Sequence, residues 1–147
     1  MKVFLDTNVL ASAAATRGLC GDVLREVLAS HDLFISEQVL DELKSVLKLK
    51  FGVAQDLIDD FIFLLQQDTV LAQPAELPRV KLQDKDDLSI LGAAIAAGAE
   101  VLVTGDKELL NLGHDEDLEI LSPRQFWEKL KTQQQRGTRR GKPRRSG

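Results

Sequence analysis

The sequence predicts an α/β fold in which a parallel sheet is covered by helices on both faces. Short apolar runs recur along the 147 residues, and each run ends at polar residues that precede a segment with helical spacing. This alternation of strands and helices is typical of parallel sheets. The length suits one domain that buries about two-thirds of its unfolded surface, so a second full domain is not expected.

The first half of the chain supplies three predicted strands. They are the apolar, largely β-branched or aromatic runs at residues 3–5, 33–35 and 69–72, the last closed by Pro74 and Pro78. Thr7 or Asn8 is expected to cap the Ala-rich helix that follows the first strand, and Ser36 precedes another helix. Apolar residues spaced for one helix face predict the remaining helices at 20–29, 37–49 and 54–67.

The second half continues the alternation. The acidic block 84–87 opens an Ala-rich helix at 88–97, which Gly98 ends as a C-cap. A buried strand at 101–103 and a short helix at 107–110 follow. A last strand is predicted at 118–121, and Ser122 with Pro123 starts a final helix that runs to about Lys131.

Charge divides the chain into two parts. The net charge is −4, yet residues 131–147 hold seven Lys or Arg and no acid, which leaves residues 1–130 at −11. Glycines lie among the arginines of the last segment, so no core can form there. We therefore expect a folded domain at 1–131 and a basic, disordered tail at 132–147.

Several classes of protein are excluded or disfavoured by composition. Cys20 is the single cysteine, which rules out an internal disulfide framework and a Cys-based zinc site. No apolar run approaches the roughly 20 residues of a membrane span, and Asp6 comes too early for a signal peptide, so a cytoplasmic protein is expected. His31 and His114 are isolated, and no nucleophile motif or phosphate-binding glycine loop is present.

Four carboxylates are predicted to meet at one edge of the sheet. Asp6 and Asp106 follow strands directly, and the carboxyl ends of parallel strands share an edge. Asp87 at a helix start and Glu42 within a helix can reach the same place. Such a cluster must hold protons or cations, and oxygen ligands select Mg²⁺ or Mn²⁺. Metal held in this way suits phosphodiester hydrolysis, which predicts a nuclease.

Structural roles remain an alternative for each acid taken alone. Asp6 could simply be a helix cap without a role in chemistry, and the acids of block 84–87 could be a solvated helix start. Glu37 and Asp41 lie on the more polar face of their helix and are expected to face solvent. Short polar residues at the strand ends could orient the carboxylates or serve only as turns and caps; they are Thr7, Asn8, Ser36 and Thr104.

Four segments resemble the motifs of the PIN-domain ribonucleases, and specifically the bacterial members related to VapC toxins. In order they are FLDTNVL at 4–10, SEQVLDEL at 36–43, DKDD at 84–87 and VTGDKELL at 103–110. Each motif alone is weak evidence, whereas four in the family order over residues 2–130 are strong evidence. The resemblance implies a three-layer α/β/α sandwich around a parallel sheet.

The resemblance also implies a site and an activity. The family acids fall on Asp6, Glu42, Asp87 and Asp106, which would be both catalytic and metal-binding. Asp84 and Asp86 are possible extra ligands, and Glu108 stands where some members have a further acid. The implied activity is Mg²⁺- or Mn²⁺-dependent cleavage of single-stranded RNA by a homodimer, with a small antitoxin protein as partner.

Two other functions remain open from the sequence. Asp6 at a strand end could be a phosphoryl acceptor, although the dehalogenase-type pattern requires an acid where this chain has Asn8. Alternatively, the domain could be a catalytically silent module that binds RNA or protein. The basic tail would then contact phosphates through Arg136, Arg139, Arg140, Lys142, Arg144 and Arg145.

Overall fold

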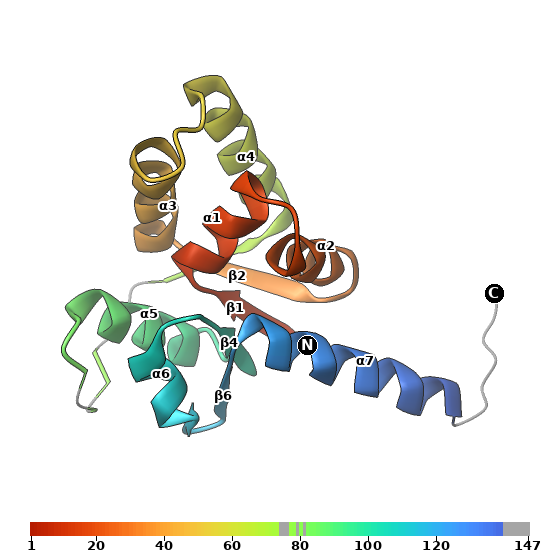
Figure 1. Ribbon diagram of the computed structural model, residues 1–147. Helices are drawn as coiled ribbons and strands as arrows, with labels where there is room; N and C mark the ends of the chain where they lie inside the picture. Colours follow the sequence, from red (N-terminus) through yellow and green to blue (C-terminus); the bar gives the residue numbers. More distant parts are fainter. Residues whose placement is uncertain (74–76, 79, 81, 140–147) are drawn as a thin grey trace.

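The structure, a computed structural model, describes residues 1–73, 77, 78, 80 and 82–139, and of residues 135–139 only the backbone. Strands and helices alternate along these residues (Figure 1). In chain order they are β1 Lys2–Leu5, α1 Thr7–Ala15, α2 Leu19–Ser30, β2 Asp32–Ser36, α3 Glu37–Leu49, α4 Gln55–Asp68, β3 Val70–Ala72, α5 Lys85–Ala96, β4 Val101–Val103, α6 Lys107–Leu112, β5 His114–Asp115, β6 Leu118–Leu121 and α7 Pro123–Arg139.

The strands form one sheet in the order β3-β2-β1-β4-β6-β5. All neighbouring pairs are parallel except β5 and β6, which pair antiparallel. Helices α1 to α4 lie on one side of the sheet and α5 and α6 on the other (Figure 1). The predicted α/β/α sandwich around a parallel sheet is therefore confirmed.

The strand order reverses direction beside β1. From β1 the chain moves outward through β2 to β3, and then returns to place β4 on the other side of β1. Crossovers between parallel strands are right-handed, so this reversal puts the two sets of helices on opposite faces. Ligand sites in such sheets lie at the carboxyl ends of the two strands that flank the reversal. Here those ends are followed by Asp6 and by residues 104–106.

The core lies along the central strands. Phe4 and Leu5 of β1 and Leu102 and Val103 of β4 have no exposed surface, as expected for strands covered on both faces. Phe126 of α7 is also fully buried. By contrast, β3 at the sheet edge leaves Val70 and Leu71 about half exposed. The best-packed strands are thus the two that lead into the reversal point.

The structure differs from the sequence-based expectations in four places. Helix α5 begins at Lys85 rather than at residue 88, and its C-cap is Ala97 rather than Gly98. The short strand β5 was not predicted, and the N-cap of α1 is Asp6 rather than Thr7 or Asn8. The final helix continues to Arg139 instead of ending near Lys131, so residues 132–139 are helical. Residues 140–147 and Pro74 lie outside the described residues. Among the described helices, none has an apolar stretch of sufficient length to cross a membrane.

Candidate active site

Asp6 lies at the junction of β1 and α1, where it is 6% exposed. Its Oδ1 accepts a hydrogen bond from the backbone N–H of Thr7 at 2.7 Å. Its Oδ2 accepts one from the hydroxyl of Thr104 at 2.6 Å. The Thr104 hydroxyl in turn accepts a bond from the backbone N–H of Asp106 at 3.0 Å. One buried hydroxyl therefore ties Asp6 to the loop that carries Asp106.

Glu42 reaches the same place from the second turn of α3. Its Oε1 accepts a hydrogen bond from the Thr7 hydroxyl at 2.9 Å. The side-chain amide of Gln38, one turn earlier, donates to Glu42 Oε2 at 3.4 Å and to Asp86 Oδ1 at 3.3 Å. Because Thr7 directly follows Asp6, these bonds join Asp6, Glu42 and Asp86 into one network across three helices.

A second group of acids lies beside this network and has few internal partners. Asp87, Asp106 and Glu108 each offer one carboxylate oxygen within 4.8 Å of the others. Asp106 Oδ1 caps α6 by accepting from the backbone N–H of Leu109 at 3.1 Å, and Glu108 accepts from the backbone N–H of Gln83 at 3.3 Å. Asp87 is 7% exposed, and within the described residues its Oδ2 is buried without a hydrogen-bond partner.

The carboxylates perturb one another. Burial, together with the nearby charges of Asp106, Asp84 and Asp6, raises the pKa of Asp87 to about 7. Burial also raises the pKa of Asp6, although its hydrogen bonds from Thr104 and Thr7 oppose the shift. The pKa of Glu42 is raised by burial and by the nearby charge of Asp86. These shifts all have the sign expected when carboxylates share a site without a cation.

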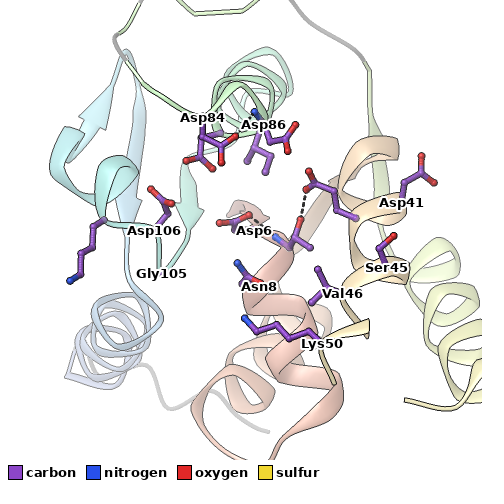
Figure 2. Close-up of a pocket in the computed structure, with 15 residues that line it drawn as sticks. Asp6, Asn8, Asp41, Ser45, Val46, Lys50, Asp84, Asp86, Gly105 and Asp106 are labelled. Carbon is purple, nitrogen blue, oxygen red and sulfur yellow. Dashed lines mark hydrogen bonds between the residues drawn. The ribbon is translucent and has the colours of Figure 1, made fainter. Parts of the chain in front are cut away.

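The candidate acids Asp6, Glu42, Asp87 and Asp106 all line one pocket of about 950 Å³ (Figure 2). Seven of its fifteen lining residues are acids. In Figure 2, Asp84 and Asp86 occupy one end of the pocket, Asn8 and Lys50 the opposite end, and Asp6 lies between them. The complete lining is Asp6, Thr7, Asn8, Asp41, Glu42, Ser45, Val46, Lys50, Asp84, Asp86, Asp87, Ile90, Gly105, Asp106 and Lys107.

The additional candidates fall in different places. Asp84 caps α5 by accepting from the backbone N–H of Asp86 at 2.8 Å, and both residues are exposed at the pocket. Asn8 is exposed and lines the pocket, whereas Glu108 joins the acidic group without lining it. Ser36 does not line the pocket and caps α3 through the N–H of Val39.

The sequence did not indicate the places of Asp41 and Gln38 at the site. Asp41, expected to face solvent, is exposed but lines the pocket, and Gln38 links two of the acids. The spacing of Gln38 one turn before Glu42 could have indicated the first of its two bonds. Its bond to Asp86 depends on how α3 lies against α5. Of the basic candidates, Arg136 and Arg139 lie in α7, and Arg140, Lys142, Arg144 and Arg145 fall outside the described residues.

The site fits a hard divalent cation. Its donors are carboxylate oxygens, which Mg²⁺ and Mn²⁺ prefer. The buried Asp87 Oδ2 has no partner among the described residues, and burying an unpaired charged oxygen is costly. A cation beside Asp87 and Asp106 would supply the missing interaction.

Comparison with known families agrees with this arrangement. The sequence profile of the PIN domain matches residues 2–108, a span that contains all four candidate acids. The chain belongs to the PIN domain family. A search of curated proteins finds no match.

Solved structures with the same fold include VapBC complexes and a VapC toxin. The chain is similar to VapBC2 from Rickettsia felis, bound to a DNA fragment from the promoter, with a TM-score of 0.58 and 19% identity over 82% of this chain and 97% of that one. It is similar to VapBC-1 from nontypeable Haemophilus influenzae, with a TM-score of 0.59 and 21% identity over 84% and 99%. The chain is also similar to VapC20 from Mycobacterium tuberculosis, a toxin that cleaves the sarcin-ricin loop. The TM-score is 0.58 and the identity is 12% over 80% of this chain and 98% of that one.

Proposed function

We propose that this protein is an Mg²⁺- or Mn²⁺-dependent endoribonuclease that cleaves single-stranded RNA. The observation that carries the proposal is Asp87, whose Oδ2 is buried without a hydrogen-bond partner among the described residues and whose carboxylate lies close to those of Asp106 and Glu108 at the reversal point of the sheet. PIN family membership and the toxin VapC20, which cleaves the sarcin-ricin loop, support nuclease chemistry.

The proposed roles follow from the hydrogen bonds of each acid. Asp87 and Asp106 would hold the cation, with Glu108 in reach of both. Asp6 and Glu42 are held toward the pocket by Thr104 and Thr7, and would complete the ligand shell directly or through water. A divalent cation in this position would lower the pKa of a water molecule and shield the charge of the attacked phosphate.

The direct test is cleavage of single-stranded RNA by purified protein with Mn²⁺ or Mg²⁺. We expect cleavage that EDTA abolishes and that Asp6→Asn removes. Asp68→Asn is a matched control, since Asp68 ends α4 and does not line the pocket. Cleavage that survives both EDTA and Asp6→Asn would contradict the proposal. Binding of RNA without cleavage would favour the alternative, a catalytically silent binding module.

We further propose that the protein is the toxin of a toxin-antitoxin pair, and that it works as a cytoplasmic homodimer. Its similarity to VapBC complexes supports this biological role. Induced expression in a bacterial host is expected to stop growth, and the Asp6→Asn variant is expected to permit it. Equal growth with both proteins would argue against a toxin, while leaving the enzymatic test above unaffected.

A further inference from the structure

The two ends of the pocket that holds the acids differ in charge. Its acidic end is formed by the starts of α5 and α6, its opposite end carries Asn8 and Lys50, and Asp6 lies between the two ends (Figure 2). Lys50 and Lys107 are the two basic residues of the lining. Lys107 directly follows Asp106 and so belongs to the acidic end. Lys50 is therefore the basic residue of the other end.

The position of Lys50 follows from the geometry of α3. Glu42, Val46 and Lys50 are spaced by four residues, so they form one row along the helix, and all three line the pocket. Eight residues of helix correspond to about 12 Å along the axis. Lys50 is the C-cap residue of α3, and in Figure 2 its side chain extends across the pocket in the direction of Asn8.

Lys50 is available to a ligand. It is exposed, and it makes no ion pair with another residue in the described parts of the chain. Its ammonium nitrogen lies 5.8 Å from the centre of the Phe51 ring, in a cation–π contact. Asn8 is likewise an exposed lining residue, and its side chain makes no hydrogen bond to another described residue. This end of the pocket thus presents an amide and an ammonium group, both of them hydrogen-bond donors.

We infer that Lys50 binds a phosphate of the RNA strand that flanks the bond to be cleaved, with Asn8 beside it. The inference rests on the proposed function for the location of the cleaved bond. A polyanionic strand laid along the pocket would bring one phosphate to the carboxylate cluster and its cation. Another phosphate farther along the strand would reach the end that holds Lys50. A basic peptide would be drawn to the acids and repelled by Lys50.

Contacts of this kind position a strand without reading its sequence. Lysine acts here as a point charge, so its loss should weaken binding evenly across sequences. Lys50 is accordingly a positioning residue, and its removal should affect KM rather than kcat.

The test compares the wild-type protein with Lys50→Gln and with the control Lys48→Gln. Lys48 is an exposed residue in the last turn of α3 that does not line the pocket. Kinetics on single-stranded RNA with Mn²⁺ should show KM raised about 5- to 10-fold by Lys50→Gln, with kcat within 2-fold, and no change with Lys48→Gln. The slope of log affinity against log salt should fall by about 0.7. An unchanged KM, or a loss confined to kcat, would overturn the inference.

The same three proteins separate this inference from the proposed function. If the wild-type protein cleaves no RNA, titration of a fluorescently labelled single-stranded RNA followed by anisotropy still measures the contribution of Lys50. Weaker binding by Lys50→Gln alone would support the phosphate contact although the nuclease proposal fails. Equal affinity of the three proteins, or no binding by any of them, would overturn it.

Discussion

The two halves of the acidic site are held in different ways. In the hydrogen-bonded half, Asp6 and Glu42 receive bonds from Thr7, Thr104 and Gln38. In the other half, Asp87, Asp106 and Glu108 lie close together, Asp106 and Glu108 accept hydrogen bonds from backbone N–H groups, and Asp87 Oδ2 has no partner among the described residues. The first half is preorganised by the protein, whereas the second half requires a proton or a cation.

The largest expected effect tests whether both halves serve the same chemistry. Asp6→Asn and Asp87→Asn should each lower the cleavage rate on the order of 10²–10³-fold, because each removes charge that stabilises the reacting centre through the cation. Rates are measured on single-stranded RNA at saturating Mn²⁺. Full activity of either variant would restrict the chemistry to the other half.

Replacement of Thr104 tests how far the hydrogen-bonded half depends on its hydroxyls. Thr104→Val removes the donor to Asp6 and the acceptor for the N–H of Asp106, while Thr104→Ser retains both. We expect Thr104→Val to reduce Mn²⁺ affinity or activity about 10- to 100-fold, with recovery in Thr104→Ser. Isothermal titration of Mn²⁺ measures the affinity, and a loss in Thr104→Ser with none in Thr104→Val would indicate a packing role for the methyl group instead.

The unpaired charge of Asp87 should lower the stability of the metal-free protein. In the absence of metal at pH 8, Asp87→Asn should raise Tm by a few degrees, since it removes a buried, unpaired charge. It should also reduce the additional rise in Tm that Mn²⁺ gives the wild-type protein. Asp41→Asn, at an exposed acid of the same pocket, is the control and should leave Tm unchanged. Thermal denaturation that shows Asp87→Asn to be less stable would contradict the account.

The pH dependence of stability sharpens the same comparison. The pKa of Asp87 is raised to about 7 in the folded protein, from 3.8, so its protonated form is favoured by folding. The stabilisation that the folded protein gains from binding this proton is complete below pH 3.8 and is lost as the pH rises through 7. Between pH 4 and 8 the metal-free wild type should therefore lose stability relative to Asp87→Asn. Urea denaturation at each pH measures the free energy of unfolding of both proteins. Parallel curves of this free energy against pH would contradict a raised pKa of Asp87.

The smallest expected effect concerns the basic C-terminal segment. Deletion of residues 132–147 should weaken RNA binding and flatten its salt dependence, because these residues carry six of the basic side chains and no acid. Anisotropy titrations at several salt concentrations measure both quantities. Unchanged binding at low salt would reject a role for this segment in RNA binding.

Most of the fold could be predicted from local patterns. Strands β1 and β4 are apolar runs that end at polar residues, and α3 has a clear apolar stripe, so their positions follow from the sequence. Strand β5 has only two residues, His114 and Asp115, and exists through its pairing with β6. No periodicity can reveal so short a strand. The end of α7 was missed because Gly137 and the arginines indicated an irregular tail, whereas the helix continues through them.

The candidate site was only partly predictable. Strand ends indicate Asp6 and Asp106, because parallel strands share an edge. The hydrogen bond from Gln38 to Asp86 joins two residues that lie 48 positions apart in the chain, on α3 and α5. It therefore depends on how these two helices pack. Side-chain donors reach Asp6 and Glu42 but leave Asp87 Oδ2 without a partner among the described residues. This difference depends on the packed positions of the side chains, which the sequence pattern does not indicate.

The most direct measurement is the anomalous diffraction of a crystal grown with Mn²⁺. We expect an anomalous peak between the carboxylates of Asp87 and Asp106, bonded to the Asp87 oxygen that has no hydrogen-bond partner among the described residues. Oxygen atoms of Asp6 or Glu42 should complete its ligand shell directly or through water. A crystal at neutral pH with ample Mn²⁺ and no peak among these carboxylates would contradict the central claim.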